Sequence, residues 1–161
     1  MTAKWWLAGA LTVLSGCGSP PPKETAQNAP AATPLAATVK PPDETRRFPL
    51  ADQVSMRLVD DHVLGKDFLP GGNVAEYRRK GKTYQQFLVR AKSPEAAALL
   101  LFDFKGHLRD AKFLPHMGGY FGLDGATPVY VFPKAAYLAG FVGLAEKDAD
   151  LLARQFAARL N

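Results

Sequence analysis

The sequence has a single cysteine, Cys17, among its 161 residues. One cysteine excludes an intramolecular disulfide and a metal cluster held by thiolates. An unpaired thiol is also a liability outside the cytoplasm, where oxidants are present. If the chain is exported, we therefore expect this thiol to be chemically modified.

The amino terminus lacks an apolar run long enough to cross a membrane as a helix. A run from Trp5 to Leu14, interrupted only by Gly9 and Thr12, follows the positive charge of Lys4. Ten residues are too few to span about 30 Å of hydrocarbon, which needs around twenty. This length is typical of the apolar region of a signal peptide. We therefore predict that residues 1–16 are a signal peptide that is cleaved.

The apolar run ends in Leu14, Ser15, Gly16 and Cys17, which resembles the lipobox of bacterial lipoproteins. Leu14 fits an apolar subsite of the signal peptidase, and the small Ser15 and Gly16 let the enzyme approach the backbone. The resemblance implies a diacylglyceryl group on the Cys17 sulfur, cleavage before Cys17, and often acylation of the freed amine. Two or three acyl chains make a stable anchor, so we expect a membrane-anchored protein.

Two other interpretations of this segment compete with the lipobox. An ordinary secretory signal cut elsewhere, for example after Ala10, would leave Cys17 free. An uncleaved membrane anchor is disfavoured by the length of the run and by the glycines and prolines that follow it.

Gly18 occupies the position where an aspartate is associated with inner-membrane retention. In a cell with two membranes, Gly18 favours the outer membrane, with the domain facing the periplasm. In a cell with one membrane, the expected location is the outer face of the plasma membrane.

Residues 18–47 lack aromatic side chains and contain seven prolines and six alanines. Such a stretch buries too little apolar surface to offset the entropy of ordering it. Together with Cys17 it forms a predicted lipidated, disordered tether over residues 17–47. Thirty residues in polyproline II reach at most about 90 Å. We favour a plain spacer over a segment that a partner recognises.

The remaining residues, 48–161, lack a concentrated positive face. They carry fifteen Lys and Arg against twelve Asp and Glu, although the whole chain has a net charge of +5. The one tight basic cluster is Arg78, Arg79, Lys80 and Lys82, which we interpret as a solvated hairpin tip. Nucleic-acid domains gather such charge beside stacking aromatics, so nucleic acid is not an expected partner.

Residues 48–161 predict a single α+β domain with an antiparallel sheet of about five strands and two helices packed on one face. Segment 54–64 fits either a strand or a helical face, and Gly71-Gly72 reads as a turn. Turns are also expected at Lys80-Gly81-Lys82, Asp124-Gly125 and Pro133-Lys134. The expected strands are Val74–Arg79, Thr83–Arg90, Tyr120–Leu123, Val129–Phe132 and Tyr137–Leu144.

Two helices complete the predicted domain. Ser93, Pro94 and Glu95 form a typical helix start. The apolar residues 96–102 indicate that this helix is buried under the sheet. A strand over residues 99–104 is the competing prediction. A loop through His107 and His116 follows. The second helix begins near Glu146, and its apolar stripe consists of Ala149, Leu152, Ala153, Phe156 and Leu160.

Four strings in this domain are also similar to a family of exported bacterial domains of unknown function. They are Leu69–Asn73, Tyr120–Gly122, Pro128–Phe132 and Leu138–Asp150. Their glycines, aromatics and aliphatics are typical of a fold and not of an active site. The resemblance therefore supports the architecture and implies no activity.

The sequence lacks a motif with catalytic or metal-binding spacing. Asp60-Asp61-His62, His107 and His116 contain ligand types for zinc, but no two-ligand motif such as HxH or HExxH is present. Gly118 and Gly119 precede an expected strand and Gly122 lies within it, whereas phosphate loops precede helices. Ser55 and Ser93 are the serines of the domain, and neither lies in a GxSxG string. We expect no catalytic residue, no metal and no cofactor.

The leading hypothesis is therefore a non-enzymatic lipoprotein whose domain binds an envelope protein or a small ligand. One competing hypothesis is an envelope hydrolase with a dispersed acid/base site, in which His107 or His116 would meet a carboxylate in a cleft. The other is a purely structural envelope component.

Overall fold

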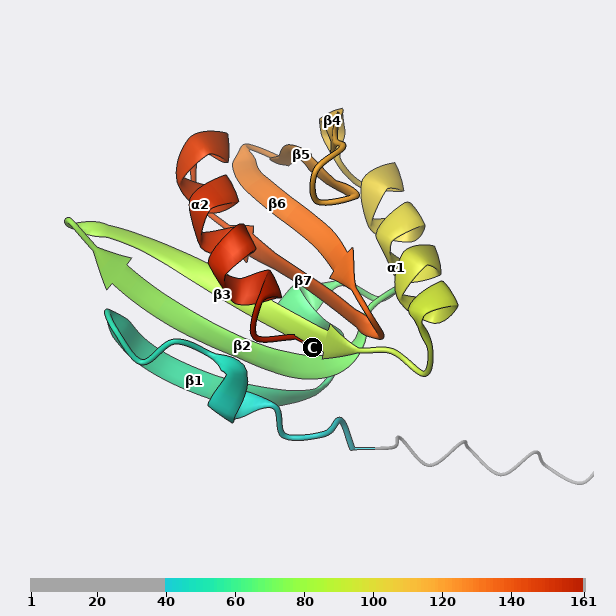
Figure 1. The fold of residues 1–161 in the computed structure, drawn as a ribbon, viewed down its shortest axis with the longest axis horizontal. Helices are drawn as coiled ribbons and strands as arrows, with labels where there is room; N and C mark the ends of the chain where they lie inside the picture. The colour runs from blue at the N-terminus through green and yellow to red at the C-terminus, as the bar shows by residue number, and fades with distance from the viewer. Residues whose placement is uncertain (1–39, 161) are drawn as a thin grey trace, which may run out of the picture. The chain divides into compact units, whose positions relative to one another are not determined.

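The computed structural model describes residues 40–160, which form an α+β domain with one antiparallel sheet of seven strands and two α-helices (Figure 1). The strand order across the sheet is β1-β2-β3-β7-β6-β5-β4. The strands are β1 (Gln53–Asp61), β2 (Pro70–Arg79), β3 (Lys82–Arg90), β4 (Arg109–Leu114), β5 (Gly119–Asp124), β6 (Thr127–Lys134) and β7 (Tyr137–Val142). The helices are α1 (Pro94–Gly106) and α2 (Glu146–Ala157), with short 3-10 turns at Thr45–Arg47 and Val63–Gly65.

The α+β class and the antiparallel sheet are confirmed, but the expected number of five strands is wrong. The two additional strands are β1, in the ambiguous segment 54–64, and β4, in the expected loop after His107. Both are edge strands. No residue of β1 is fully buried, and only Leu114 of β4 is. A strand that buries so little carries a weak apolar pattern, which explains why the sequence did not reveal them.

Two of the predicted turns lie elsewhere. Gly71 and Gly72 are inside β2, where a Cβ on Gly71 would collide with the Asp60 backbone oxygen on β1. These glycines therefore serve close packing of neighbouring strands and not a turn. Pro133 and Lys134 belong to β6, and the chain reverses at Ala135 and Ala136. The Lys80-Gly81 hairpin turn is confirmed, with both residues at positive φ as a two-residue turn of this kind requires.

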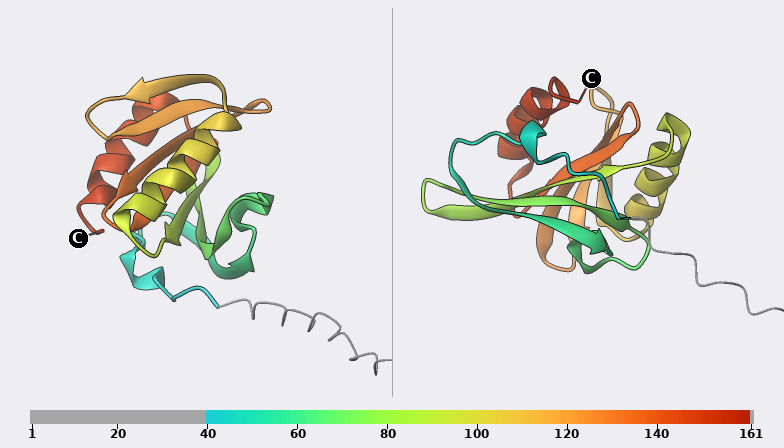
Figure 2. Two further views of the ribbon diagram at one scale, coloured as in Figure 1. Left: turned by 90° about the vertical axis from the view of Figure 1, so that its right-hand side faces the viewer. Right: turned by 90° about the horizontal axis from the view of Figure 1, so that it is seen from below.

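The two helices pack on opposite faces of the sheet, so the prediction that both cover one face is wrong (Figure 2). Neighbouring residues of the central strands alternate between the two cores. On β6, Tyr130 and Phe132 pack with α2, whereas Val129 and Val131 pack with α1. The continuous apolar run of β6 is the pattern of a strand that is covered on both faces.

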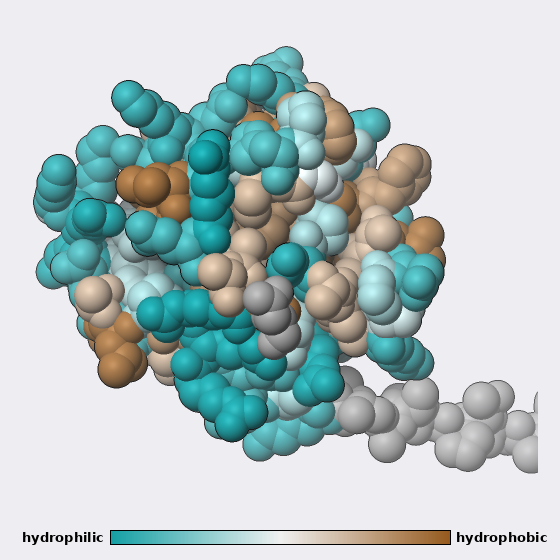
Figure 3. Space-filling model, in the orientation of Figure 1, coloured by the Kyte–Doolittle hydropathy of each residue, from teal (hydrophilic) through white to brown (hydrophobic). Residues whose placement is uncertain are grey.

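The predicted start of α1 is confirmed, since the Ser93 Oγ accepts a hydrogen bond from the Ala96 N–H at 3.2 Å. The competing strand over 99–104 is wrong. The helix is not buried all round, however. Ala97, Leu101 and Phe104 face the sheet, while Leu99 and Phe102 are 67% and 68% exposed. Hydrophobic side chains accordingly gather over α1 on the molecular surface (Figure 3).

The predicted stripe of α2 is confirmed. Ala149, Ala153, Phe156 and Leu160 are buried and Leu152 is partly buried, and Phe156 packs against Phe48 and Phe141. This face of the sheet also holds four of the five tyrosines, Tyr77, Tyr84, Tyr130 and Tyr137.

Packing begins before the expected domain start at Phe48. Glu44 is only 4% exposed, and its carboxylate accepts hydrogen bonds from Arg47 (2.6 Å), Arg90 (3.1 Å) and the Tyr137 hydroxyl (3.0 Å). Its backbone N–H donates to the side chain of Asn73 on β2. Burial raises the pKa of Glu44, but the hydrogen bonds from Arg47 and Tyr137 outweigh it and leave the pKa below the ordinary 4.5. The end of the expected tether is thus part of the domain.

Within residues 40–160, neither helix has the length and apolar character needed to cross a membrane.

Candidate functional site

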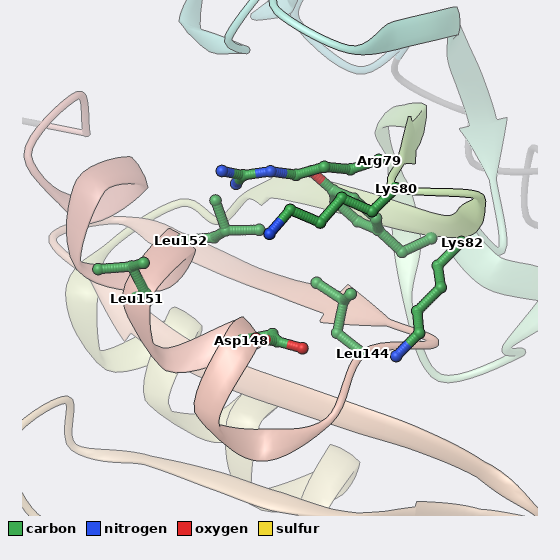
Figure 4. A pocket seen from close by; sticks show the side chains of 8 residues that line it. Arg79, Lys80, Lys82, Leu144, Asp148, Leu151 and Leu152 are labelled. Atoms are coloured by element: carbon green, nitrogen blue, oxygen red, sulfur yellow. The ribbon is translucent and has the colours of Figure 1, made fainter.

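A groove lies between the tip of the β2–β3 hairpin and α2 (Figure 4). Its volume is about 320 Å³, and we call it the cationic groove. Basic side chains come from the hairpin, aliphatic ones from α2 and the residues before it. The lining consists of Arg79, Lys80, Lys82, Tyr84, Leu144, Asp148, Leu151 and Leu152.

The hairpin turn sets the position of the basic side chains. Arg79 and Lys82 are paired across the hairpin in register, and Lys80 with Gly81 forms the turn between them. The three cationic residues therefore lie within one turn of the chain. In Figure 4 the Arg79 and Lys80 side chains extend over the groove toward Leu152, whereas Lys82 lies beside Leu144.

Most of the positive charge in the groove is not paired. Arg79 lies 3.9 Å from Asp52, at the outer limit of an ion pair. Among the described residues, Lys80 and Lys82 form no ion pair within 4 Å, and neither does Asp148. Three cations face one carboxylate in the lining, so the groove has a surplus of two positive charges and favours an anion.

Tyr84 brings a hydroxyl group to the same groove. Its ring is buried, stacking on Tyr77 at 5.2 Å between centroids and packing against Phe141 at 6.3 Å. In the described part of the chain its hydroxyl has no hydrogen-bond partner. Burial raises the pKa of Tyr84, so the phenol stays protonated at neutral pH and keeps an O–H to donate.

The aliphatic wall of the groove is partly open to solvent. Leu144 is buried and Leu152 is partly buried, but Leu151 is 57% exposed on α2. A small hydrophobic area surrounded by hydrophilic side chains marks α2 on the surface (Figure 3). Exposed apolar surface therefore lies next to cationic side chains in this groove.

The metal-ligand types considered from the sequence do not come together. Asp60 and Asp61 end β1, His62 follows in a left-handed conformation, and His107 stacks on Phe68 at 4.2 Å beyond α1. Across residues 40–160 no group of three or more His, Cys, Asp or Glu side chains is arranged to hold a metal ion.

His116 is the one histidine that meets a carboxylate away from its own loop. Its Nε2 lies 2.5 Å from Asp150 Oδ1 on α2, and the same oxygen accepts a hydrogen bond from the Tyr130 hydroxyl at 2.7 Å. Arg154 donates to the other oxygen at 2.6 Å. Burial raises the pKa of Asp150, but the hydrogen bonds from His116, Tyr130 and Arg154 outweigh it and leave the pKa below 3.8.

This second cluster links α2 to β6 and to the turn between β4 and β5. Asp150 is fully engaged by three partners, and none of the four residues lines the cationic groove. The two serines in the described range are remote from it or occupied. Ser55 lies on β1, at the opposite edge of the sheet from β4, and Ser93 caps α1. Nucleophilic catalysis needs such a group beside the base.

The basic cluster is evident from the sequence, but the groove that it helps to form is not. The sequence alone predicts a solvated tip for Arg79, Lys80 and Lys82, because nothing in the hairpin itself indicates a second element beside it. The groove exists because α2 crosses the same face of the sheet, where Leu152 points toward the hairpin tip and Leu151 lines the outer end of the groove. A sequence signal was available in Leu151, an apolar residue that lies off the buried stripe of α2.

The residues of the predicted lipid attachment and cleavage site, Leu14, Ser15, Gly16 and Cys17, lie outside the described part of the chain. The same holds for most of the predicted tether.

No family model, no curated protein and no solved structure matches the chain.

Proposed function

We propose that the chain is an exported lipoprotein, anchored to a membrane through lipid on Cys17, whose domain binds a ligand or partner at the cell envelope. The anchoring rests on the string Leu14–Cys17 at the end of a charged and then apolar segment. The outer membrane is the favoured location in a cell with two membranes.

The observation that carries the binding role is the cationic groove. Lys80 and Lys82 have no ion-pair partner in the described range, and they stand beside the exposed Leu151. Repulsion between neighbouring like charges and exposure of a leucine to water both destabilise the folded domain. A ligand that neutralises the charges would remove the repulsion, and a ligand that covers Leu151 would remove the exposure.

Mass analysis of the mature amino terminus tests the anchor. The native protein should begin at Cys17 and carry acyl mass, and Cys17→Ser should lose both that mass and retention in the membrane fraction. A mature protein that begins elsewhere, or that lacks acyl mass, contradicts the anchoring.

Affinity capture from solubilised envelopes tests the binding role of the groove. The wild-type chain should recover an envelope component that Lys80→Glu/Lys82→Glu does not. The control Lys92→Glu/Lys134→Glu carries the same charge change at exposed positions outside the groove. Equal recovery by the two variants would contradict a role for the groove.

A hydrolase is a second candidate because His116 meets Asp150 at 2.5 Å. Its test is hydrolysis of ester, phosphoester and glycoside substrates by the wild type and by His116→Ala. Turnover that disappears in His116→Ala would favour the hydrolase over the binding protein.

A further inference from the structure

We infer that the cationic groove binds an anionic amphiphile, a molecule in which a phosphate or carboxylate head group is joined to an aliphatic chain. The inference rests on the proposed role of this groove as the binding surface of the domain. It adds the chemical class of the ligand.

The head group follows from the donors that converge on the groove. Arg79, Lys80 and Lys82 supply guanidinium and ammonium groups, and Tyr84 supplies a hydroxyl. Guanidinium and ammonium groups recognise phosphate and carboxylate oxygens through charge-assisted hydrogen bonds. Asp148 lines the groove beside Leu144, while Arg79 and Lys80 extend toward Leu152 (Figure 4). The anion therefore binds at Arg79 and Lys80, on the side away from Asp148.

The aliphatic part of the ligand is inferred from the leucine side chains that line the groove. Leu144, Leu151 and Leu152 carry no polar side-chain atom, and they occupy the α2 side of a space of about 320 Å³. An inorganic anion would leave Leu151 exposed. A chain attached to the head group covers it, and the burial of each CH₂ contributes about 0.8 kcal/mol.

The same lining disfavours nucleic acid as the anion. Single strands bind on exposed aromatic platforms that stack on the bases. Tyr84 is the aromatic residue of this groove, and its ring already stacks on Tyr77 and is only 6% exposed.

Photo-crosslinking of the full chain, purified in a neutral maltoside detergent, tests the inference. The probes are an alkyl phosphate with a diazirine in its chain, the corresponding alkyl alcohol, and inorganic phosphate as a competitor. The alkyl phosphate should label peptides that contain residues 79–84 or 144–152. The alcohol should label them at least about tenfold less, and millimolar inorganic phosphate should compete weakly.

Variants locate the two halves of the ligand. Lys80→Glu/Lys82→Glu should lower labelling at least about tenfold, while Lys92→Glu/Lys134→Glu should not change it. Leu151→Ser should lower labelling, while Leu99→Ser, at a leucine of similar exposure on α1, should not. Asp148→Asn removes a repulsive charge and should raise labelling about 1.4- to fivefold, the range of a surface ion pair. Unchanged thermal unfolding of each variant shows that it is folded.

A diacyl phosphatidic acid probe with the same diazirine identifies the source of the ligand. Labelling by this probe in the groove identifies a membrane lipid, whereas labelling by the monoalkyl phosphate alone identifies a free amphiphile, and both agree with the inference. Labelling outside the groove, equal labelling by the alcohol, or labelling that survives Lys80→Glu/Lys82→Glu overturns it.

The inference and the proposed function fail in different ways. A chain without acyl mass on Cys17 contradicts the anchoring and leaves crosslinking in the groove unaffected. If capture through Lys80 and Lys82 recovers an envelope protein but no amphiphile labels the groove, the ligand class is wrong and the proposed binding role stands.

Discussion

Single residues decide how the amino-terminal end of the domain is held. Glu44 is far in sequence from Arg90 and Tyr137, and yet its carboxylate joins both to Arg47. Arg47 also donates to the backbone oxygen of Arg159 at 2.7 Å, and its guanidinium lies 5.0 Å from the centre of the Tyr137 ring. No local sequence pattern indicates a cluster of residues that lie up to 112 positions apart. Glu44 was therefore not expected to belong to the domain, and it falls within the predicted tether.

Glu44→Gln should lower the free energy of unfolding at pH 7 by about 1.5–3 kcal/mol, because the amide is uncharged and replaces one of the two acceptor oxygens with an NH₂ group. The pKa of Glu44 is depressed in the folded state, so its contribution is present above the unfolded pKa of about 4.5 and disappears as the pH falls through the folded value. The difference between wild type and variant should therefore shrink below about pH 4.5. Urea unfolding at pH 7 and pH 3.5 measures it. Asp103→Asn, at an exposed carboxylate of α1, is the control, and a pH-independent difference would contradict the prediction.

Gly140 on β7 shows why one residue in the centre of the sheet lacks a side chain. A Cβ there would lie 2.6 Å from Cε1 of Phe87 and still closer to the backbone oxygen of Tyr130. The ring of Phe87, which is paired with Gly140 on the neighbouring strand β3, occupies the space that a side chain here would need. Gly140→Ala should lower the free energy of unfolding by about 1–3 kcal/mol through overpacking. Gly106→Ala, where a Cβ meets nothing within 4 Å, is the matched control. Equal chemical denaturation midpoints for the two variants would refute this account.

At the scale of elements, the strongest local signals predicted structure correctly. The hairpin of β2 and β3, the cap at Ser93 and the stripe of α2 each combine a turn or cap residue with clear periodicity. The wrong predictions concern segments whose structure depends on a second element of the fold. β4 exists because β5 pairs with it, and Leu99 and Phe102 are exposed because they lie off the face of α1, Ala97, Leu101 and Phe104, that packs on the sheet. Neither fact is encoded within the segment concerned.

Two phenylalanines of α1 test this account of the helix. Phe104 is fully buried against Phe87, whereas Phe102 is 68% exposed. Phe104→Ala should therefore lower the free energy of unfolding by about 3–5 kcal/mol, and Phe102→Ala should change it by less than about 0.5 kcal/mol. Guanidinium unfolding of both variants measures the difference. A large loss for Phe102→Ala would show that its ring is covered in the folded protein.

At the scale of the whole molecule, α1 and α2 pack on opposite faces of the sheet. Each helix covers its own hydrophobic core, and the two cores share the same central strands. On β3, Phe87 packs in the core of α1, while the next residue, Leu88, packs in the core of α2. The prediction that both helices cover one face is wrong because the position of a helix along the sequence does not determine on which side it crosses the sheet. The all-apolar run from Val129 to Phe132 was the available signal, since it requires cover on both faces.

Because the two cores share strands β3, β6 and β7, neither should melt alone, and unfolding of residues 40–160 should be a single transition. The position of the tyrosines makes this testable. Tyr77, Tyr84, Tyr130 and Tyr137 all belong to the core of α2, so near-ultraviolet circular dichroism reports mainly on that face. Phe104→Ala removes a side chain from the core of α1 on the other face. It should shift the near-ultraviolet transition as far as the far-ultraviolet one, and Phe156→Ala should shift both in the same way. If Phe104→Ala lowers the far-ultraviolet midpoint while the tyrosine signal keeps its wild-type midpoint, the cores unfold independently and the shared strands do not couple them.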